Sequence, residues 1–115
     1  MKFLLMITDV AGAWDALSPA EQEGVMSGHR RFGEALHAER KFVSAFRLRP
    51  ADTARTVRFR PEDGRTVTDG PFSETKEVMG GYYVIDVPSM DEAIEWAKQI
   101  PLAYPSSVEV RPVWE

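Results

Sequence analysis

Two helix-start signals divide this chain into its structural elements. Each places a serine at an N-cap position and a glutamate three residues later: Ser18 with Glu21, and Ser89 with Glu92. Such pairs form a capping box, in which each side chain bonds the backbone N–H of the other residue. Pro19 strengthens the first signal, because proline at the first helical position sacrifices no hydrogen bond. Two helices are therefore expected, with other elements before, between and after them.

The first helix is expected to run to about Glu39 and the second to stop at Pro101, since proline cannot continue a helix. The first helix carries side chains separated by four, three and four residues, which predict one buried stripe: Val25, His29, Phe32 and Leu36. His29 is the polar member of this stripe. An imidazole buried there needs a hydrogen-bond partner, because burying an unpaired polar group costs about 1–3 kcal/mol.

The remaining segments have the patterns of strands. Residues 2–8 and 80–87 are apolar on both faces, as is typical of central strands covered on two sides. Alternating patterns predict further strands in residues 40–49, 54–60, 66–68 and 107–113. In residues 40–49 the alternation predicts that four side chains share a face: Phe42, Ser44, Phe46 and Leu48. Asp63-Gly64 is a hairpin-turn signal.

This order of elements predicts an α+β protein with the ferredoxin-like βαββαβ plan and an extra short strand or hairpin. Both helices would cover one face of an antiparallel sheet. Strands that are apolar on both faces leave the helix-free face in need of cover. We therefore expect a homodimer that packs sheet to sheet. The 115 residues suit a single domain spanning residues 1–115.

Composition excludes several classes of function. The chain has no cysteine, which removes disulfides, thiolate ligands and a cysteine nucleophile and suits a cytoplasmic protein. The first apolar run, residues 3–7, is far too short to span a membrane. His29 and His37 lie eight residues apart, about 12 Å along a helix, which is too far for one metal ion. We expect neither a metal nor a cofactor.

Charge is unevenly distributed along the chain. The formal net charge is −4, yet 10 of the 14 basic residues and only 5 acidic residues lie between Arg30 and Arg65, which leaves that segment at +5. A basic surface can bind nucleic acid, and basic side chains are also common on exposed strand edges. The overall acidity and the lack of interleaved exposed aromatics disfavour direct nucleic-acid binding.

The stretch from Thr66 to Tyr83 contains the other candidate site residues. Asp69 is followed by Gly70 and Pro71, which predict a rigid corner. A carboxylate held there could meet His29 and make it a general acid or base. A purely structural His–Asp pair, or an exposed His29 with no partner, would fit the sequence as well.

Two side chains near this corner are candidates to bind a substrate: Lys76 for an anion and Tyr83 for a hydroxyl or anion. Gly70 and Pro71 would line the same site. The Gly80-Gly81 pair would allow close approach of another backbone or of a small ligand. We therefore assign His29 and Asp69 as catalytic candidates and an unknown small molecule as ligand.

Three segments of the chain resemble the DGPF or YCII-related proteins: VTDGPFSETKEVMGGYYVIDV (67–87), DEAIEWAKQIP (91–101) and VEVRPV (108–113). The opening KFLLMI and the helix with His29 also look like that family, so the resemblance covers nearly the whole chain. It implies a dimeric α+β barrel-like assembly and a His–Asp active site, which falls on His29 and Asp69. The family commonly has Ala-Gly where Glu39-Arg40 stand, and a Gly where Pro105-Ser106 stand.

Two functions fit these observations. The first is a small acid–base enzyme with isomerase, lyase or lactone-type chemistry, in which Asp69 orients His29. The second is a non-catalytic dimeric module that binds a small ligand or a regulatory partner. The resemblance also links such proteins to control of transcription by alternative sigma factors.

Overall fold

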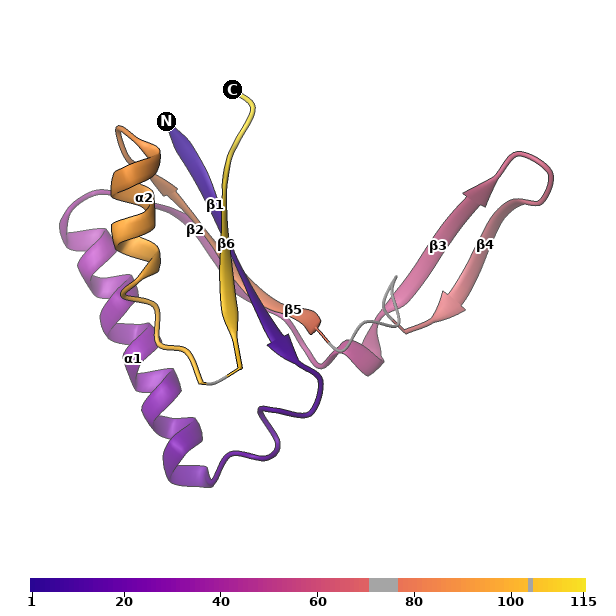
Figure 1. Ribbon diagram of the computed structural model, residues 1–115, viewed down its shortest axis with the longest axis horizontal. Helices are drawn as coiled ribbons and strands as arrows, with labels where there is room; N and C mark the ends of the chain where they lie inside the picture. The colour runs from indigo at the N-terminus through magenta and orange to yellow at the C-terminus, as the bar shows by residue number, and fades with distance from the viewer. Residues whose placement is uncertain (71–76, 104) are drawn as a thin grey trace.

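The computed structural model describes residues 1–70, 77–103 and 105–115. Its main sheet contains four antiparallel strands in the order β2-β5-β1-β6. The bounds of these strands are Phe42–Arg47 for β2, Glu77–Asp86 for β5, Lys2–Val10 for β1 and Ser107–Pro112 for β6. Two helices, α1 (Pro19–Ala38) and α2 (Met90–Ala97), pack on one face of this sheet (Figure 1). The predicted α+β ferredoxin-like architecture is confirmed.

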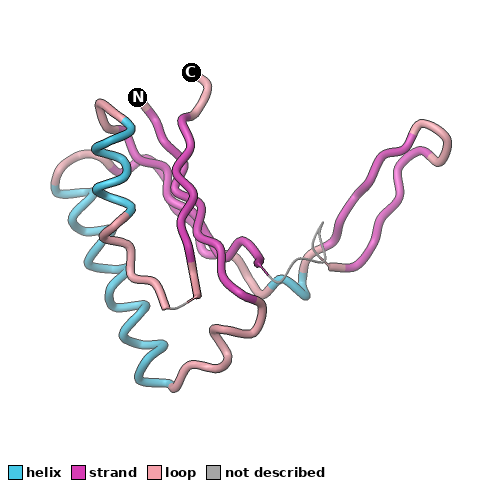
Figure 2. Tube along the Cα trace, in the orientation of Figure 1, coloured by secondary structure: helices cyan, strands magenta, loops and turns pink. Residues whose placement is uncertain are grey.

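A separate two-stranded sheet projects from this body. It pairs β3 (Arg55–Arg60) with β4 (Gly64–Asp69) around the predicted Asp63-Gly64 turn, where Gly64 has a φ of 69°. A short 3₁₀ helix, η1 (Ala51–Thr53), precedes it. Figure 2 shows the hairpin reaching away from both helices and from the main sheet. The extra hairpin was expected, but it forms its own sheet instead of joining the main one.

The helices begin where the serine signals predict. The Ser18 side chain accepts a bond from the Glu21 N–H, and the Glu21 carboxylate accepts one from the Ser18 N–H. In α2 the Ser89 side chain accepts a bond from the Glu92 N–H, but the Glu92 carboxylate binds Nζ of Lys41, so the second predicted capping box is half-formed. No helix of the described residues is long and apolar enough to cross a membrane.

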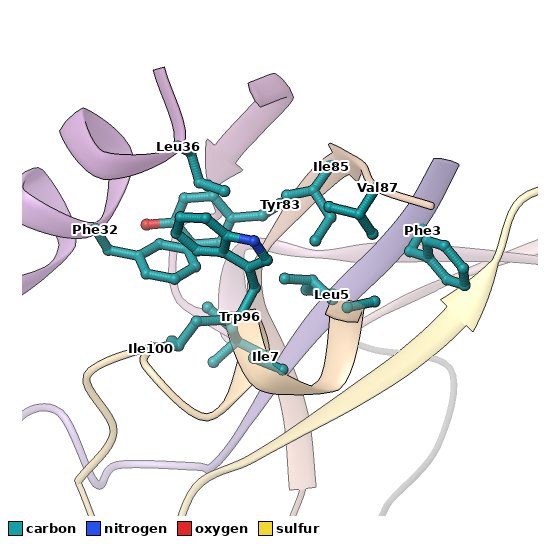
Figure 3. Packing of buried hydrophobic residues seen from close by; sticks show 12 residues of the cluster. Phe3, Leu5, Ile7, Phe32, Leu36, Tyr83, Ile85, Val87, Trp96 and Ile100 are labelled. Atoms are coloured by element: carbon teal, nitrogen blue, oxygen red, sulfur yellow. The ribbon is translucent and has the colours of Figure 1, made fainter. Parts of the chain in front are cut away.

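The core lies between the helices and the inward face of the sheet. Figure 3 shows this cluster, which is built from apolar residues of β1, β5, α1 and α2 and of the segments that follow β5 and α2: Phe3, Leu5, Ile7, Phe32, Leu36, Tyr83, Ile85, Val87, Ala93, Trp96, Ala97 and Ile100. The Phe32 ring packs edge to face against two aromatic rings, with centroid separations of 4.9 Å to Tyr83 and 6.0 Å to Trp96. Two of the four stripe residues of α1, Phe32 and Leu36, are thus fully in the core.

Strand β2 corrects one expectation from the sequence. A β-bulge between Phe42 and Ser44 shifts the register, so Phe42 and Ala45 both lie across from buried residues of β5. Ser44 and Phe46 lie on the opposite face. The predicted shared face for Phe42 and Phe46 is therefore wrong, because the extra residue of a bulge reverses the alternation.

Candidate functional site

His29 lies on α1 one turn before Phe32, where the helix leaves the core. Its ring is half-buried, and its Nδ1 lies 2.8 Å from the hydroxyl oxygen of Tyr83. The two rings are stacked with an interplanar angle of 10°. The polar member of the α1 stripe therefore has the hydrogen-bond partner that its burial requires, and this partner comes from β5.

A cavity of about 220 Å³ opens beside His29. Its walls come from α1, from β1, β2 and β5 of the sheet and from the loop that joins β1 to α1: Ile7, Asp9, Trp14, Val25, Met26, His29, Ala45, Phe46, Arg47, Gly80, Gly81, Tyr82 and Tyr83. Most of this lining is apolar, with a few polar groups among it. That combination is typical of a small-molecule site.

Gly80 and Gly81 form the part of this cavity where β5 carries no side chain. A Cβ at Gly81 would lie 2.8 Å from the carbonyl oxygen of Phe46, and one at Gly80 would lie 2.8 Å from Oδ2 of Asp9. The expected close approach of another backbone is therefore present at Gly81. The glycine pair also leaves room for the inward-facing side chains of β1 and β2.

Asp9 is the carboxylate that the fold brings to His29. It lies near the end of β1, lines the same cavity, and accepts a hydrogen bond from the Ser106 hydroxyl. The sequence reading missed it, because an acid at the end of an apolar run looks like a strand terminator. The available signal was its position two residues after Ile7, in the inward-facing series of β1.

Arg47 is the second charged residue of this cavity that the sequence reading missed. Its guanidinium lies over the indole ring of Trp14, 4.6 Å from the ring centroid. Trp14 is itself held to α1, because the Gln22 side chain donates a bond to its carbonyl oxygen.

The surroundings of His29 and Tyr83 determine their protonation. Burial is the main influence on His29 and lowers the pKa of its imidazole; the charge of Asp9 raises it and the charge of Arg47 lowers it further. Burial also raises the pKa of the Tyr83 phenol. At neutral pH the site therefore pairs an uncharged imidazole with an uncharged phenol.

The structure separates the predicted partners His29 and Asp69 within the chain. Asp69 ends β4 on the projecting hairpin, its side chain is 89% exposed, and its carboxylate pairs with Nε of Arg55 at 3.0 Å. Asp69 was expected on a strand of the main sheet, where its carboxylate could reach His29. Among the described strands β4 pairs with β3 alone, so it carries Asp69 away from the His29 cavity.

The other sequence candidates have different outcomes. Tyr83 contacts His29 directly. Gly70 forms the expected corner with a φ of 92°, and its N–H donates to Ala54 while its carbonyl accepts from the Thr56 hydroxyl. It fastens the base of the hairpin and does not line the cavity. Pro71 and Lys76 lie outside the described residues.

Comparison with known proteins gives the family. The YCII-related domain matches residues 1–115. An uncharacterised protein of Rhizobium meliloti (strain 1021) is 39% identical over 111 residues, which cover 90% of this chain and 82% of that protein. The family match extends over the whole chain, including α1 with His29 and the strands that form the cavity. The chain therefore belongs to the YCII-related family.

Proposed function

We propose that this protein is a small acid–base enzyme whose active site is the His29 cavity. The observation that carries this proposal is a half-buried imidazole, hydrogen-bonded to Tyr83, that lines a cavity large enough for a small organic molecule. Burial holds the pKa of His29 below its ordinary value, so the ring is neutral and able to accept a proton at neutral pH.

The contact with Tyr83 prepares the ring for proton transfer. When Nδ1–H donates to the Tyr83 oxygen, Nε2 keeps its lone pair. This nitrogen would take a proton from a C–H beside a substrate carbonyl, while the C–H electron pair moves toward the carbonyl oxygen. Return of the proton to another carbon completes an isomerisation, and departure of a leaving group completes an elimination. The negative charge of Asp9 would stabilise the imidazolium formed in between.

The direct test is hydrogen–deuterium exchange in D₂O, followed by NMR, across a panel of small carbonyl, lactone and haloaromatic compounds. The wild-type protein should exchange or convert at least one of them, and His29→Gln should lose about 100-fold or more of this rate. His37→Gln is the matched control, because His37 is exposed on α1 and stacks on Phe42 outside the cavity. Equal rates for wild type and His29→Gln would refute the proposal.

A second pair of variants separates the two candidate carboxylates. Asp9→Asn should slow the reaction, because it removes the charge that stabilises the imidazolium. Asp69→Asn should leave the rate unchanged if the site is complete within one chain, since Asp69 pairs with Arg55 on the hairpin. If instead Asp69→Asn slows the reaction and Asp9→Asn does not, the result would favour the His29–Asp69 active site that the family resemblance implies.

A non-catalytic small-ligand or regulatory module is the alternative, since a largely apolar cavity would serve it as well. Ligand binding that survives His29→Ala and His29→Gln, together with no exchange or turnover by the wild type, would favour this module. The link to sigma-factor control rests on the family resemblance alone.

We also propose that the protein forms a homodimer through the face of the main sheet that the helices leave uncovered. Strand register places five apolar or aromatic side chains on this open face: Leu4, Met6, Phe46, Tyr82 and Val84. Phe46 is 65% exposed in the single chain. Contiguous apolar surface of this kind favours burial against a second copy.

A further inference from the structure

Arg47 is the exposed last residue of β2, and it lies on the helix-facing side of the sheet. In the pairing of β2 with β5, Ala45 lies opposite Tyr83 and Arg47 opposite Gly81, so Arg47 continues the helix-facing series of β2. Side chains two residues apart on a strand share a face. The guanidinium is therefore directed to the side of the sheet that contains His29, and it lines the cavity.

The fold provides Arg47 with an aromatic support and with no carboxylate. Among the residues that the structure describes, Arg30, Arg55 and Arg111 pair with acids, whereas Arg47, which lines the cavity, forms no ion pair. Its guanidinium stacks on Trp14. A guanidinium held by its face keeps the N–H groups at its edge available, and these match the two oxygens of a carboxylate.

Asp9 and Arg47 form no ion pair with each other in the part of the chain that the structure describes. The two residues come from strands on opposite sides of β5, and the Gly80-Gly81 segment lies between them. The Asp9 carboxylate is bound by Ser106. The cavity thus has a positive end at Arg47 and a negative residue at Asp9, with the uncharged His29 and Tyr83 beside them.

The dimensions of the cavity limit the ligand. A volume of about 220 Å³ lies below the range of about 300–1,000 Å³ that is usual for ligand pockets, which suits one small ring or a short branched chain. Arg47 lies one side-chain repeat beyond Tyr83 along the sheet, which is about 7 Å. A small ligand with its anionic group bound at Arg47 would therefore have the rest of its body in the cavity beside the His29–Tyr83 pair.

We propose that Arg47 is the anion anchor of this site and that the ligand is a small organic monocarboxylate with an otherwise apolar body. The proposal rests on the proposed function in that it names the substrate class of the same site. A dianion is disfavoured, because Asp9 shares the cavity.

The test uses benzoate and benzamide as probes of nearly equal shape, with binding followed by saturation-transfer NMR and by the ring signals of His29. Benzoate should bind the wild-type protein about tenfold or more tightly than benzamide, and inorganic phosphate should not displace it. Arg47→Gln should remove this preference, whereas Arg49→Gln, which changes a neighbouring arginine outside the cavity lining, should keep it. Arg47→Lys should retain part of it, since it keeps the charge and loses the planar fork.

The comparison of benzoate with benzamide needs only the wild-type protein, so it stands even if Arg47→Gln fails to fold. Equal binding of the two probes, no binding of benzoate, displacement by phosphate, or an unchanged preference in a folded Arg47→Gln variant would overturn the proposal. His29→Gln should still bind benzoate. Benzoate binding that depends on Arg47, in a protein with no exchange activity, would leave the anion site standing and refute the enzyme.

Discussion

His29 shows how one residue can be polar, half-buried and satisfied at the same time. Its Nδ1 is bonded to Tyr83, and its ring extends the apolar stripe of α1 toward the cavity. Three influences act on the protonation of its ring: burial and the positive charge of Arg47 favour the neutral form, and the negative charge of Asp9 favours the charged form. Burial is the strongest of these, so protonation of His29 opposes folding.

This balance predicts a specific pH dependence of stability. In the unfolded chain His29 takes up a proton near its ordinary pKa of 6.5, whereas in the folded chain it does so only at a lower pH. The free energy of unfolding should therefore be unaffected above that value and should fall as the pH drops from 6.5 toward the folded pKa. Urea unfolding between about pH 5 and 7, above the range of most carboxylates, measures this effect.

His29→Gln should flatten the dependence in this window, and His37→Gln should leave it intact. A wild-type protein whose stability rises as the pH drops through 6.5 would show that Asp9 outweighs burial. NMR titration of the two histidine rings, assigned with the two variants, gives the folded pKa of His29 independently.

The end of α1 shows a strained element that a single substitution can relieve. Arg40 has a φ of 58°, in the left-handed region that favours glycine. The N–H of Lys41 donates to the Leu36 carbonyl and that of Arg40 to the His37 carbonyl, which together form a Schellman motif. Glycine is the usual residue at this position of the motif, and here an arginine adopts the left-handed conformation.

We predict that Arg40→Gly stabilises the protein by about 0.5–1 kcal/mol. The left-handed conformation costs a residue with a side chain about 1–2 kcal/mol, and the greater freedom of glycine in the unfolded chain offsets part of the gain. Glu39→Gly is the matched control: Glu39 has a φ of −94°, so glycine there should only destabilise. Urea denaturation at pH 7 measures both, and a loss of stability in Arg40→Gly would contradict the prediction.

The contact of β2 with β5 predicts a second effect on an element. Gly81→Ala should destabilise the protein by about 1–3 kcal/mol, because its Cβ would come within 2.8 Å of the Phe46 carbonyl oxygen and β2 would have to shift. Gly33→Ala on α1 meets nothing within 4 Å and should be neutral or stabilising by up to about 1 kcal/mol. The urea denaturation midpoints of the two variants measure this difference. Similar midpoints for both would show that β2 can shift without a loss of stability.

The elements were predictable from the sequence, whereas their partners were less so. Capping boxes and alternation act over a few residues, and they located both helices and the hairpin turn. The position of Asp69 depends on which strand β4 pairs with, and the residues at the two ends of β4 carry no sequence signal for that pairing. Of the residues that line the cavity, His29 was singled out as the polar member of an apolar stripe and Tyr83 as a substrate-binding candidate, but their contact with each other was not foreseen. Asp9 and Arg47 were missed, because a charge at the end of a strand resembles an ordinary boundary.

At the scale of the whole molecule, the single chain is more open than a compact domain of its length. Its radius of gyration is 16.1 Å, against about 13–14 Å for a compact chain of this length. The projecting hairpin (Figure 1) contributes to this, and one of its faces exposes three apolar side chains: Val57, Phe59 and Val67. An isolated two-stranded hairpin is marginally stable in water. The open sheet face and the hairpin therefore both favour contact with a second copy.

The proposed homodimer leads to the last prediction. The wild-type protein should sediment at about twice its chain mass of 13.0 kDa, and Met6→Glu should shift it to a single chain or prevent folding. Met6 lies in the middle of the open face, between Tyr82 of β5 and Glu109 of β6, and Arg111 already pairs with Glu109, so the new carboxylate would be buried in the dimer beside an existing acid. Ile94→Glu, on the outer side of α2 where the side chain is 37% exposed, should leave the dimer intact. Analytical ultracentrifugation over a range of concentrations measures all three, and a wild-type protein that remains a single chain throughout would rule out the sheet-to-sheet assembly.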